Sequence, residues 1–306
     1  MRVFFIFLPI FLAACSTGRF YKHNETNSVQ LSSQTREVTE ILSKADLACV
    51  STPQTRAEKN KQNTVIVHPG LLLFNLNWDQ SLAVESAKLL IKNGFARDFI
   101  ELRDRENIAI SELLKREPGN RFIGLQYSIG GQPRLIAATL ANFRQASHSG
   151  STQYFYYPIL VDPFDIGNLN NFLSLDSTEL GQMFIVVSRE RALLRPSMDA
   201  IPNNILNHNK LHLLYAEDFG GNWGHFDALS AIVSGGGTAR FKEIFFLIAS
   251  SINTGLPSNE LAARLDFLKI KYAAKDARPV SSSWLSSASK ISCHQVAGRM
   301  SNVVVQ

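Results

Sequence analysis

The chain is poor in cysteine, and beyond its first residues it has no long apolar run. It contains 3 cysteines in 306 residues, with no Cys-x-x-Cys pair and no Cys/His cluster of the kind that holds zinc. We therefore expect neither a metal site nor a cofactor. No later run approaches the roughly 20 apolar residues that a membrane-spanning helix needs. No internal repeat is visible, so the sequence does not indicate a solenoid or a propeller.

Blocks of like charge are also missing. The formal net charge is +5 and 19% of residues are charged, but the basic residues are scattered along the chain. Nucleic-acid-binding proteins gather such residues into patches or runs, so we expect no nucleic-acid partner. The 45% hydrophobic content is that of an ordinary globular protein with a sizeable core.

The first residues, MRVFFIFLPIFLAACSTG, look like an export signal. Arg2 precedes an apolar run from Val3 to Leu12 that is too short to span a bilayer. The run ends in Leu-Ala-Ala-Cys15, which resembles the lipobox of bacterial lipoproteins. The resemblance implies that the mature chain starts at Cys15 and is lipid-anchored in the bacterial cell envelope. Ser16, where aspartate is associated with inner-membrane retention, favours the outer membrane. The alternative is an ordinary signal peptide that is cut near Ala14.

Two further cysteines, Cys49 and Cys293, lie before and after the part of the chain with regular structure. In an oxidising compartment such a pair indicates a disulfide. The alternative is two unpaired cysteines, with one or both of them buried.

Composition and periodicity divide the chain into an export signal (1–14), a polar tether and N-terminal segment (15–60), a core (61–250) and a C-terminal helix and tail packed on that core (251–306). Strands are predicted at Thr64–Val67, Phe99–Leu102, Phe122–Tyr127, Tyr156–Val161, Met183–Val187 and Leu211–Tyr215. Helices are predicted at Arg36–Ala48, Ser81–Asn93, Ser111–Arg116, Pro133–Phe143, Leu169–Leu180 and Ser258–Lys275 and from Phe226 onward, and Ser281–Ser289 is predicted to be a loop. This alternation predicts an α/β fold, in which a mostly parallel central sheet has helices on both faces.

One predicted strand leads into a glycine-flanked serine. The segment RFIGLQYSIGG runs from Arg121 to Gly131 and places Ser128 between a strand and a helix. It resembles the nucleophile elbow of the α/β-hydrolase family, written G-x-S-x-G, in which small residues flank a serine on a tight turn. Gly130 and Gly131 fit this pattern. Gln126 departs from it, because the family has glycine at that position.

Two other segments occur in the chain order of that family. His68-Pro69-Gly70-Leu71 resembles the turn that supplies part of an oxyanion hole, so the resemblance implies backbone N–H donors at Ile129 and at Leu71 or a neighbour. We interpret His68 itself as a structural residue and not as a catalytic one.

The second segment, EDFGGNWGHFD, follows the last predicted strand and delivers His225 from a glycine-rich loop. In the family this is the place of the general base.

The third member of a triad has three candidates in the sequence. Asp162 and Asp165 follow the predicted strand that ends at Val161, and Glu190 follows the next strand. The run Asp-Pro-x-Asp-x-Gly resembles the aspartate segment of chlorophyllases and, more loosely, that of platelet-activating-factor acetylhydrolases. We therefore prefer Asp162 and keep Asp165 and Glu190 as alternatives.

These resemblances imply a membrane-anchored serine hydrolase that acts on a small-molecule ester or lipid. Apolar residues at 71–74 and in the segment 164–172 favour acyl or lipid esters over peptides and sugars. The alternative is an inactive hydrolase-fold lipoprotein that serves as a binding or assembly factor, because a fold by itself does not establish an activity.

Overall fold

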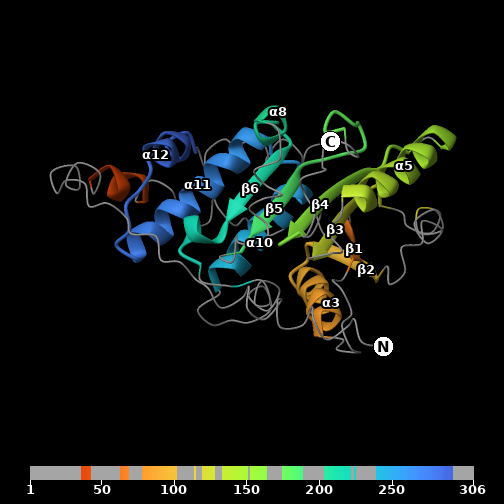
Figure 1. The fold of residues 1–306 in the computed structure, drawn as a ribbon, viewed down its shortest axis with the longest axis horizontal. Helices are drawn as coiled ribbons and strands as arrows, with labels where there is room; N and C mark the ends of the chain where they lie inside the picture. The colour runs from red at the N-terminus through yellow and green to blue at the C-terminus, as the bar shows by residue number, and fades with distance from the viewer. Residues whose placement is uncertain are drawn as a thin grey trace, which may run out of the picture.

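The described strands of this protein form one parallel sheet in the computed structural model (Figure 1). The structure describes residues 36–42, 63–68, 78–101, 114, 119–127, 133–150, 152–163, 174–188, 203–221, 224 and 239–291. Within these residues the strands are β1 (Asn63–His68), β2 (Ala96–Glu101), β3 (Arg121–Tyr127), β4 (Phe155–Val161), β5 (Met183–Val187) and β6 (Leu211–Tyr215). The sheet order is β2-β1-β3-β4-β5-β6, and every neighbouring pair is parallel. The predicted α/β class with a parallel sheet is confirmed.

The same residues form helices α3 (Trp78–Lys92), α5 (Pro133–Ser149), α8 (Asn203–Leu206), α10 (Ala239–Thr254), α11 (Ser258–Lys275) and α12 (Ser282–Ala288), and the 3₁₀ helix η4 (Ala216–Phe219). Residues 36–42 are also helical, and Val38 and Ile41 are buried. α11 begins and ends where its apolar periodicity predicts, and α5 continues beyond Phe143 to Ser149.

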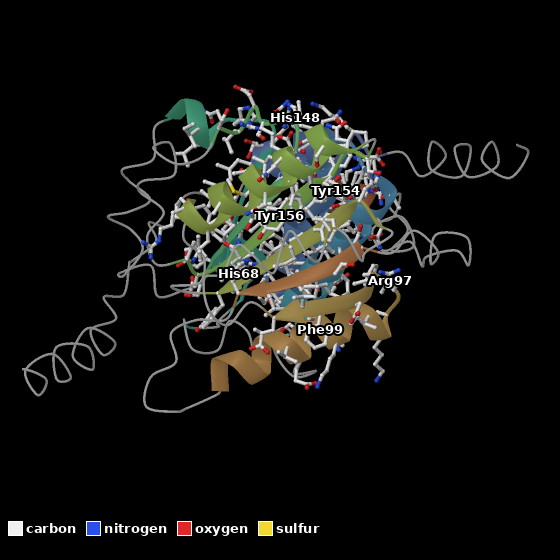
Figure 2. All side chains as sticks on the ribbon, turned by 90° about the vertical axis from the view of Figure 1, so that its right-hand side faces the viewer. His68, Arg97, Phe99, His148, Tyr154 and Tyr156 are labelled. Atoms are coloured by element: carbon white, nitrogen blue, oxygen red, sulfur yellow. The ribbon has the colours of Figure 1, made fainter. Side chains whose placement is uncertain are left out.

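Helices cover both faces of the sheet. One hydrophobic cluster joins α3, α10, α11 and α12 to side chains such as Val65, Leu125 and Val186. A second cluster joins α5 to Ile66 and Phe122 on the opposite face. Figure 2 looks at the β2 edge of the sheet and shows α5 on one side of the strands and α3 on the other. Burial from both sides explains why β1 is buried at every residue and why the sequences of β4 and β5 are continuously apolar or aromatic.

The predicted helix Leu169–Leu180 is wrong over residues 174–180, which form turns that end in a bridge between Leu180 and Tyr156. The N–H of Tyr156 donates to the carbonyl of Glu179 (2.8 Å), and the N–H of Gly181 donates to the carbonyl of Tyr156 (2.8 Å). Serine and threonine in this stretch compete for backbone hydrogen bonds, so pairing with β4 prevails over a helical turn.

The predicted loop Ser281–Ser289 is also wrong, because most of it is helix α12. The side chain of Ser281 caps the helix by accepting a hydrogen bond from the N–H of Ser283. Leu285 and Ala288 are buried, and this burial stabilises a helix whose serine content alone does not favour it.

No described helix has the length and the apolar character needed to cross a membrane.

Candidate active site

The order of the strands creates a switch point between β1 and β3. From β1 the chain continues to β2 on one side, and it later returns to place β3 on the other side of β1. In open parallel sheets, ligands bind outside the carboxyl ends of the strands at such a point. His68 at the end of β1 is paired in register with Gln126 near the end of β3. Ser128 follows Gln126 by two residues, so the sequence places the candidate nucleophile directly after the strand that borders the switch point.

The elements that flank Ser128 are those that a nucleophile elbow requires. β3 ends at Tyr127 and α5 begins at Pro133, where proline is well tolerated because the first turn of a helix needs no N–H donor. A strand therefore leads into a helix through a short connection. Ser128 itself lies in that connection, outside the described residues.

Gln126, which departs from the hydrolase pattern, is buried and hydrogen-bonded in the structure. Its side chain is fully buried, and its Nε2 donates to Oη of Tyr156 on β4 at 2.7 Å. The Tyr156 ring occupies the space above Gly124, where an added Cβ would lie 2.0 Å from the tyrosine oxygen. Glycine at position 124 thus makes room for the tyrosine that binds Gln126. Burial raises the pKa of the Tyr156 phenol, which therefore stays neutral.

Asp162 lies one residue beyond β4, at the same edge of the sheet. Its side chain is fully buried, and its backbone adopts φ 47°, a left-handed conformation that aspartate tolerates better than most residues. Its N–H donates to the carbonyl of Val186 (2.8 Å), and its Oδ1 accepts a hydrogen bond of 2.6 Å from the N–H of Ser188. The carboxylate is therefore held between the ends of β4 and β5.

Asp162 is also close to the chain as it leaves β3. Val161 and Tyr127 are register partners on adjacent parallel strands, and such strands lie about 4.8 Å apart. Asp162 and Ser128 each follow one member of this pair. Asp162 is therefore placed at the carboxyl edge next to the strand that Ser128 follows, whereas the alternative acids Asp165 and Glu190 lie outside the described residues.

His68 is buried on the face of β1 that carries Ile66 (Figure 2). Burial lowers the pKa of His68 to about 4, so the imidazole is neutral near pH 7. A base with so low a pKa accepts a proton poorly at that pH. These properties support the interpretation of His68 as a residue other than the general base.

Three buried polar atoms at this edge have no hydrogen-bond partner within the described part of the chain. They are Nε2 of His68, Oε1 of Gln126 and Oγ of Ser188, which end or follow β1, β3 and β5. Buried polar atoms in native proteins are nearly always paired, and the residues that follow β1, β3 and Ser188 lie outside the described part of the chain. The unpaired atoms gather at the edge where the candidate triad is expected.

The glycine-rich segment that carries His225 begins at the same edge. β6 leads into η4, and Gly220 then adopts φ 66°. β6 is three strand spacings, or about 14 Å, from β3.

Most residues singled out by the sequence lie outside the described residues. They are Ser128, His225, Ile129, Leu71, Asp165 and Glu190 in the site, Cys15 at the lipobox, and the cysteines Cys49 and Cys293. The described residues contain no cluster of three or more His, Cys, Asp or Glu side chains that would hold a metal ion.

Sequence analysis missed the Gln126–Tyr156 pair and the partner of Asp162. A glycine inside an apolar strand, Gly124, was the available signal for the first, because such a glycine marks a close approach by another group. The second depends on the alignment of β4 with β5, for which the sequence holds no local signal.

No protein-family model, curated protein or solved structure matches this chain.

Proposed function

We propose that this protein is a serine hydrolase of the α/β-hydrolase fold that cleaves carboxylic esters with Ser128, His225 and Asp162. The observation that carries the proposal is the buried Asp162 carboxylate, held at the carboxyl edge one strand away from the serine-bearing β3. The order serine, aspartate, histidine along the chain is that of the α/β-hydrolases. The position of β3 at the switch point of the sheet adds support.

In the proposed reaction, Ser128 Oγ attacks the ester carbonyl carbon and passes its proton to His225. The N–H groups of Ile129 and of Leu71 or a neighbour bind the oxyanion. His225 then protonates the leaving alcohol and an acyl-enzyme forms, which water hydrolyses with His225 again as the base. Asp162 orients the imidazole and stabilises its protonated form.

The proposed substrates are acyl or lipid esters, and the proposed location is the bacterial envelope. Both follow from the sequence: the apolar residues near the expected site and the lipobox at Cys15. Lipid anchoring, with the outer membrane preferred, would hold the enzyme beside such substrates. Mass spectrometry of the mature protein tests the anchor, since acyl chains should be present on wild type and absent from Cys15→Ser.

A fluorophosphonate probe tests the reaction, because serine displaces fluoride from it only where a base activates the hydroxyl. We expect labelling of the wild type and none of Ser128→Ala. Ser149→Ala is the matched control, since Ser149 is exposed at the end of α5, and it should label like wild type. Labelling that persists in Ser128→Ala would contradict the proposal.

A second function is favoured by one observation. Gln126 fills a position where the hydrolase elbow has glycine, and its side chain is buried there. An inactive binding or assembly lipoprotein would tolerate that residue. In that case neither wild type nor Gln126→Gly reacts with the probe.

A further inference from the structure

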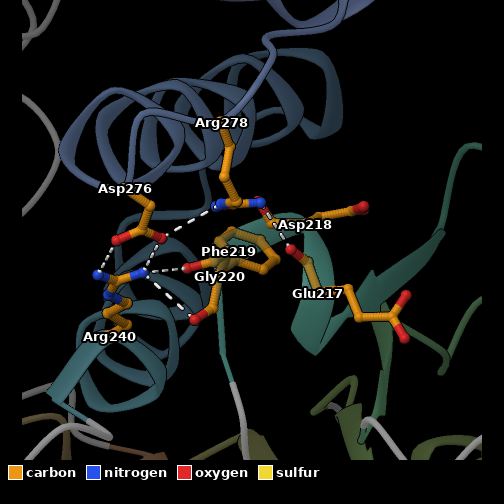
Figure 3. A network of polar contacts seen from close by, with 7 residues as sticks. All are labelled: Glu217, Asp218, Phe219, Gly220, Arg240, Asp276 and Arg278. Carbon is orange, nitrogen blue, oxygen red and sulfur yellow. Dashed lines mark hydrogen bonds and ion pairs between the residues drawn. The ribbon is translucent and has the colours of Figure 1, made fainter. Parts of the chain in front are cut away.

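The two edge strands of the sheet, β6 and β2, differ in how they are protected. None of the residues of β6 is exposed, and the strand continues directly into η4. The carbonyls of residues 217–220 accept hydrogen bonds from Arg240 and Arg278, which share the Asp276 carboxylate (Figure 3). The chain that follows β6 is therefore fixed to α10 and to the end of α11.

The opposite edge strand, β2, has exposed residues instead (Figure 2). Arg97 and Asp98 are both exposed, and among the described strands β2 pairs only with β1. An edge strand of this kind presents main-chain N–H and C=O groups with which another strand can pair. We therefore looked for features of β2 that oppose such pairing.

Asp98 occupies one of the main-chain donors of β2. The N–H of Phe99 donates to Oδ1 of Asp98 at 2.7 Å, in an exposed position. An N–H group carries one hydrogen, so this donor cannot bond a second strand while the contact persists. Pairing would also remove the Asp98 carboxylate from water, which is costly for a charged group.

The register of β2 adds a second obstacle beside Asp98. Ala96 is paired with Asn63, and Asp98 is paired with Thr64, the next residue of β1, so Arg97 is an extra residue in β2. Such a bulge bends a strand and disturbs its hydrogen-bonding pattern. Natural sheets combine bulges with charged side chains at their edges to prevent edge-to-edge pairing.

The rest of β2 is suited to pairing with its own copy. In an antiparallel pair centred on Phe99, the two phenylalanines are opposite each other and Arg97 is opposite Glu101 of the second copy. Aromatic pairs and opposite charges at such positions stabilise a sheet. Asp98, in contrast, is opposite the apolar Ile100. We propose that Asp98 prevents β2 from pairing with β2 of a second copy of this chain.

The test measures self-association of the full-length protein. Asp98→Val removes the carboxylate and places a β-branched side chain opposite Ile100 of a second copy. Gln145→Val is the matched control, because it adds the same side chain at an exposed position of helix α5. Asp98→Val combined with Arg97→Glu tests the register, because it places two carboxylates opposite each other.

Two measurements report the result. Sedimentation velocity gives the association state over about 1–100 µM protein, a range suited to an interface smaller than the usual area of about 1,600 Å². Hydrogen exchange of residues 96–101 shows whether β2 itself becomes protected.

We expect wild type and Gln145→Val to share one association state and fast exchange in β2. Asp98→Val should associate further as its concentration rises, with exchange in β2 slowed about tenfold or more. The added Arg97→Glu should raise the dissociation constant of that dimer about tenfold.

Three results would overturn the proposal. In the first, Asp98→Val keeps the association state of wild type over the whole range. In the second, Gln145→Val associates as strongly as Asp98→Val. In the third, β2 is already protected in wild type in a concentration-dependent way, since its edge would then be paired in the native protein. If circular dichroism shows that Asp98→Val does not fold, Asp98→Thr decides by the same criteria, because threonine suits a strand and has no charge.

Discussion

The backbone N–H of Ser188, one residue beyond β5, donates a 2.6 Å hydrogen bond to the carboxylate of Asp162, one residue beyond β4. This contact ties the ends of two adjacent parallel strands and holds a fully buried acid at the carboxyl edge of the sheet. A charged acceptor makes such a bond stronger than a neutral one. The orientation of the carboxylate is therefore set by the sheet itself.

If the proposed reaction takes place, Asp162→Asn should lower kcat for ester hydrolysis by about 10²–10⁴-fold, because an amide cannot stabilise the imidazolium of the proposed base, His225. Asparagine tolerates the left-handed backbone, and its oxygen still accepts the Ser188 N–H, so the unfolding free energy should change by only about 1–2 kcal/mol. Glu190→Gln is the comparison, and it should retain activity. If Glu190→Gln is inactive and Asp162→Asn is active, the acid follows β5 and not β4.

Acid should destabilise the fold through two buried histidines. Burial lowers the pKa of His68 and of His212 to about 4, whereas unfolded histidine titrates near 6.5. The unfolded chain therefore takes up protons first as the pH falls. The stability that each neutral histidine contributes is complete above about pH 6.5, is lost progressively toward pH 4, and amounts to about 3 kcal/mol for each.

Urea unfolding at pH 7, 5.5 and 4.5 measures this effect. His68→Gln and His212→Gln should each reduce the loss of unfolding free energy between pH 7 and pH 4.5. Both variants are compared with wild type at each pH, so that any constant cost of the substitution cancels. Equal losses in wild type and both variants would show that other groups cause the acid sensitivity.

The hydrogen bond between Gln126 and Tyr156 should stabilise the fold beneath α5. Tyr156→Phe removes the acceptor and leaves a buried amide donor unpaired, which should cost about 1–3 kcal/mol of unfolding free energy. Gln126→Met combined with Tyr156→Phe removes both partners. The double variant should lose less than the sum of the two single variants. If denaturant unfolding shows that the free-energy losses of the two single variants add up to that of the double variant, Gln126 and Tyr156 do not stabilise the fold through their hydrogen bond.

Helix α12 should depend on its N-terminal cap. Ser281→Ala removes the side-chain acceptor for the N–H of Ser283, at a cost of about 1 kcal/mol. Ser286→Ala is the control, since Ser286 is exposed inside the same helix and alanine is a better helix former. Calorimetry should show a lower melting temperature only for Ser281→Ala. If Ser286→Ala lowers the melting temperature and Ser281→Ala does not, the Ser281 cap does not stabilise α12.

The sequence alone predicted the strands and most of the longer helices, because the spacing of apolar residues reflects which positions of each strand or helix are buried. β5 and β6 have the predicted bounds, and β1, β3 and β4 are each longer than predicted by only one or two residues. β2, predicted at Phe99–Leu102, begins three residues earlier, at Ala96, and ends at Glu101. Runs such as MFIVV are apolar at every position because the sheet is covered on both faces. The parallel α/β class follows from the same pattern.

Local composition was misleading where a tertiary contact outweighs a weak local preference. A helix was predicted over Leu169–Leu180, yet Leu180 bridges to Tyr156 and residues 174–180 form turns. The serine-rich stretch 281–289 lacks helix formers, yet burial of Leu285 and Ala288 stabilises a helix. Propensities differ by less than 1 kcal/mol per residue, so a few buried contacts decide such segments.

Only the tertiary structure decided which residues meet at the carboxyl edge. The sequence by itself predicted that strands end at Val67, Tyr127 and Val161, and that Asp162 follows the last of these. Apolar strands are chemically alike, so nothing within them specifies that β1 lies between β2 and β3 or that Asp162 reaches Ser188. Strand order and register result from how all the helices and strands pack together, and that packing also brings Arg240 to Gly220 and Asp276.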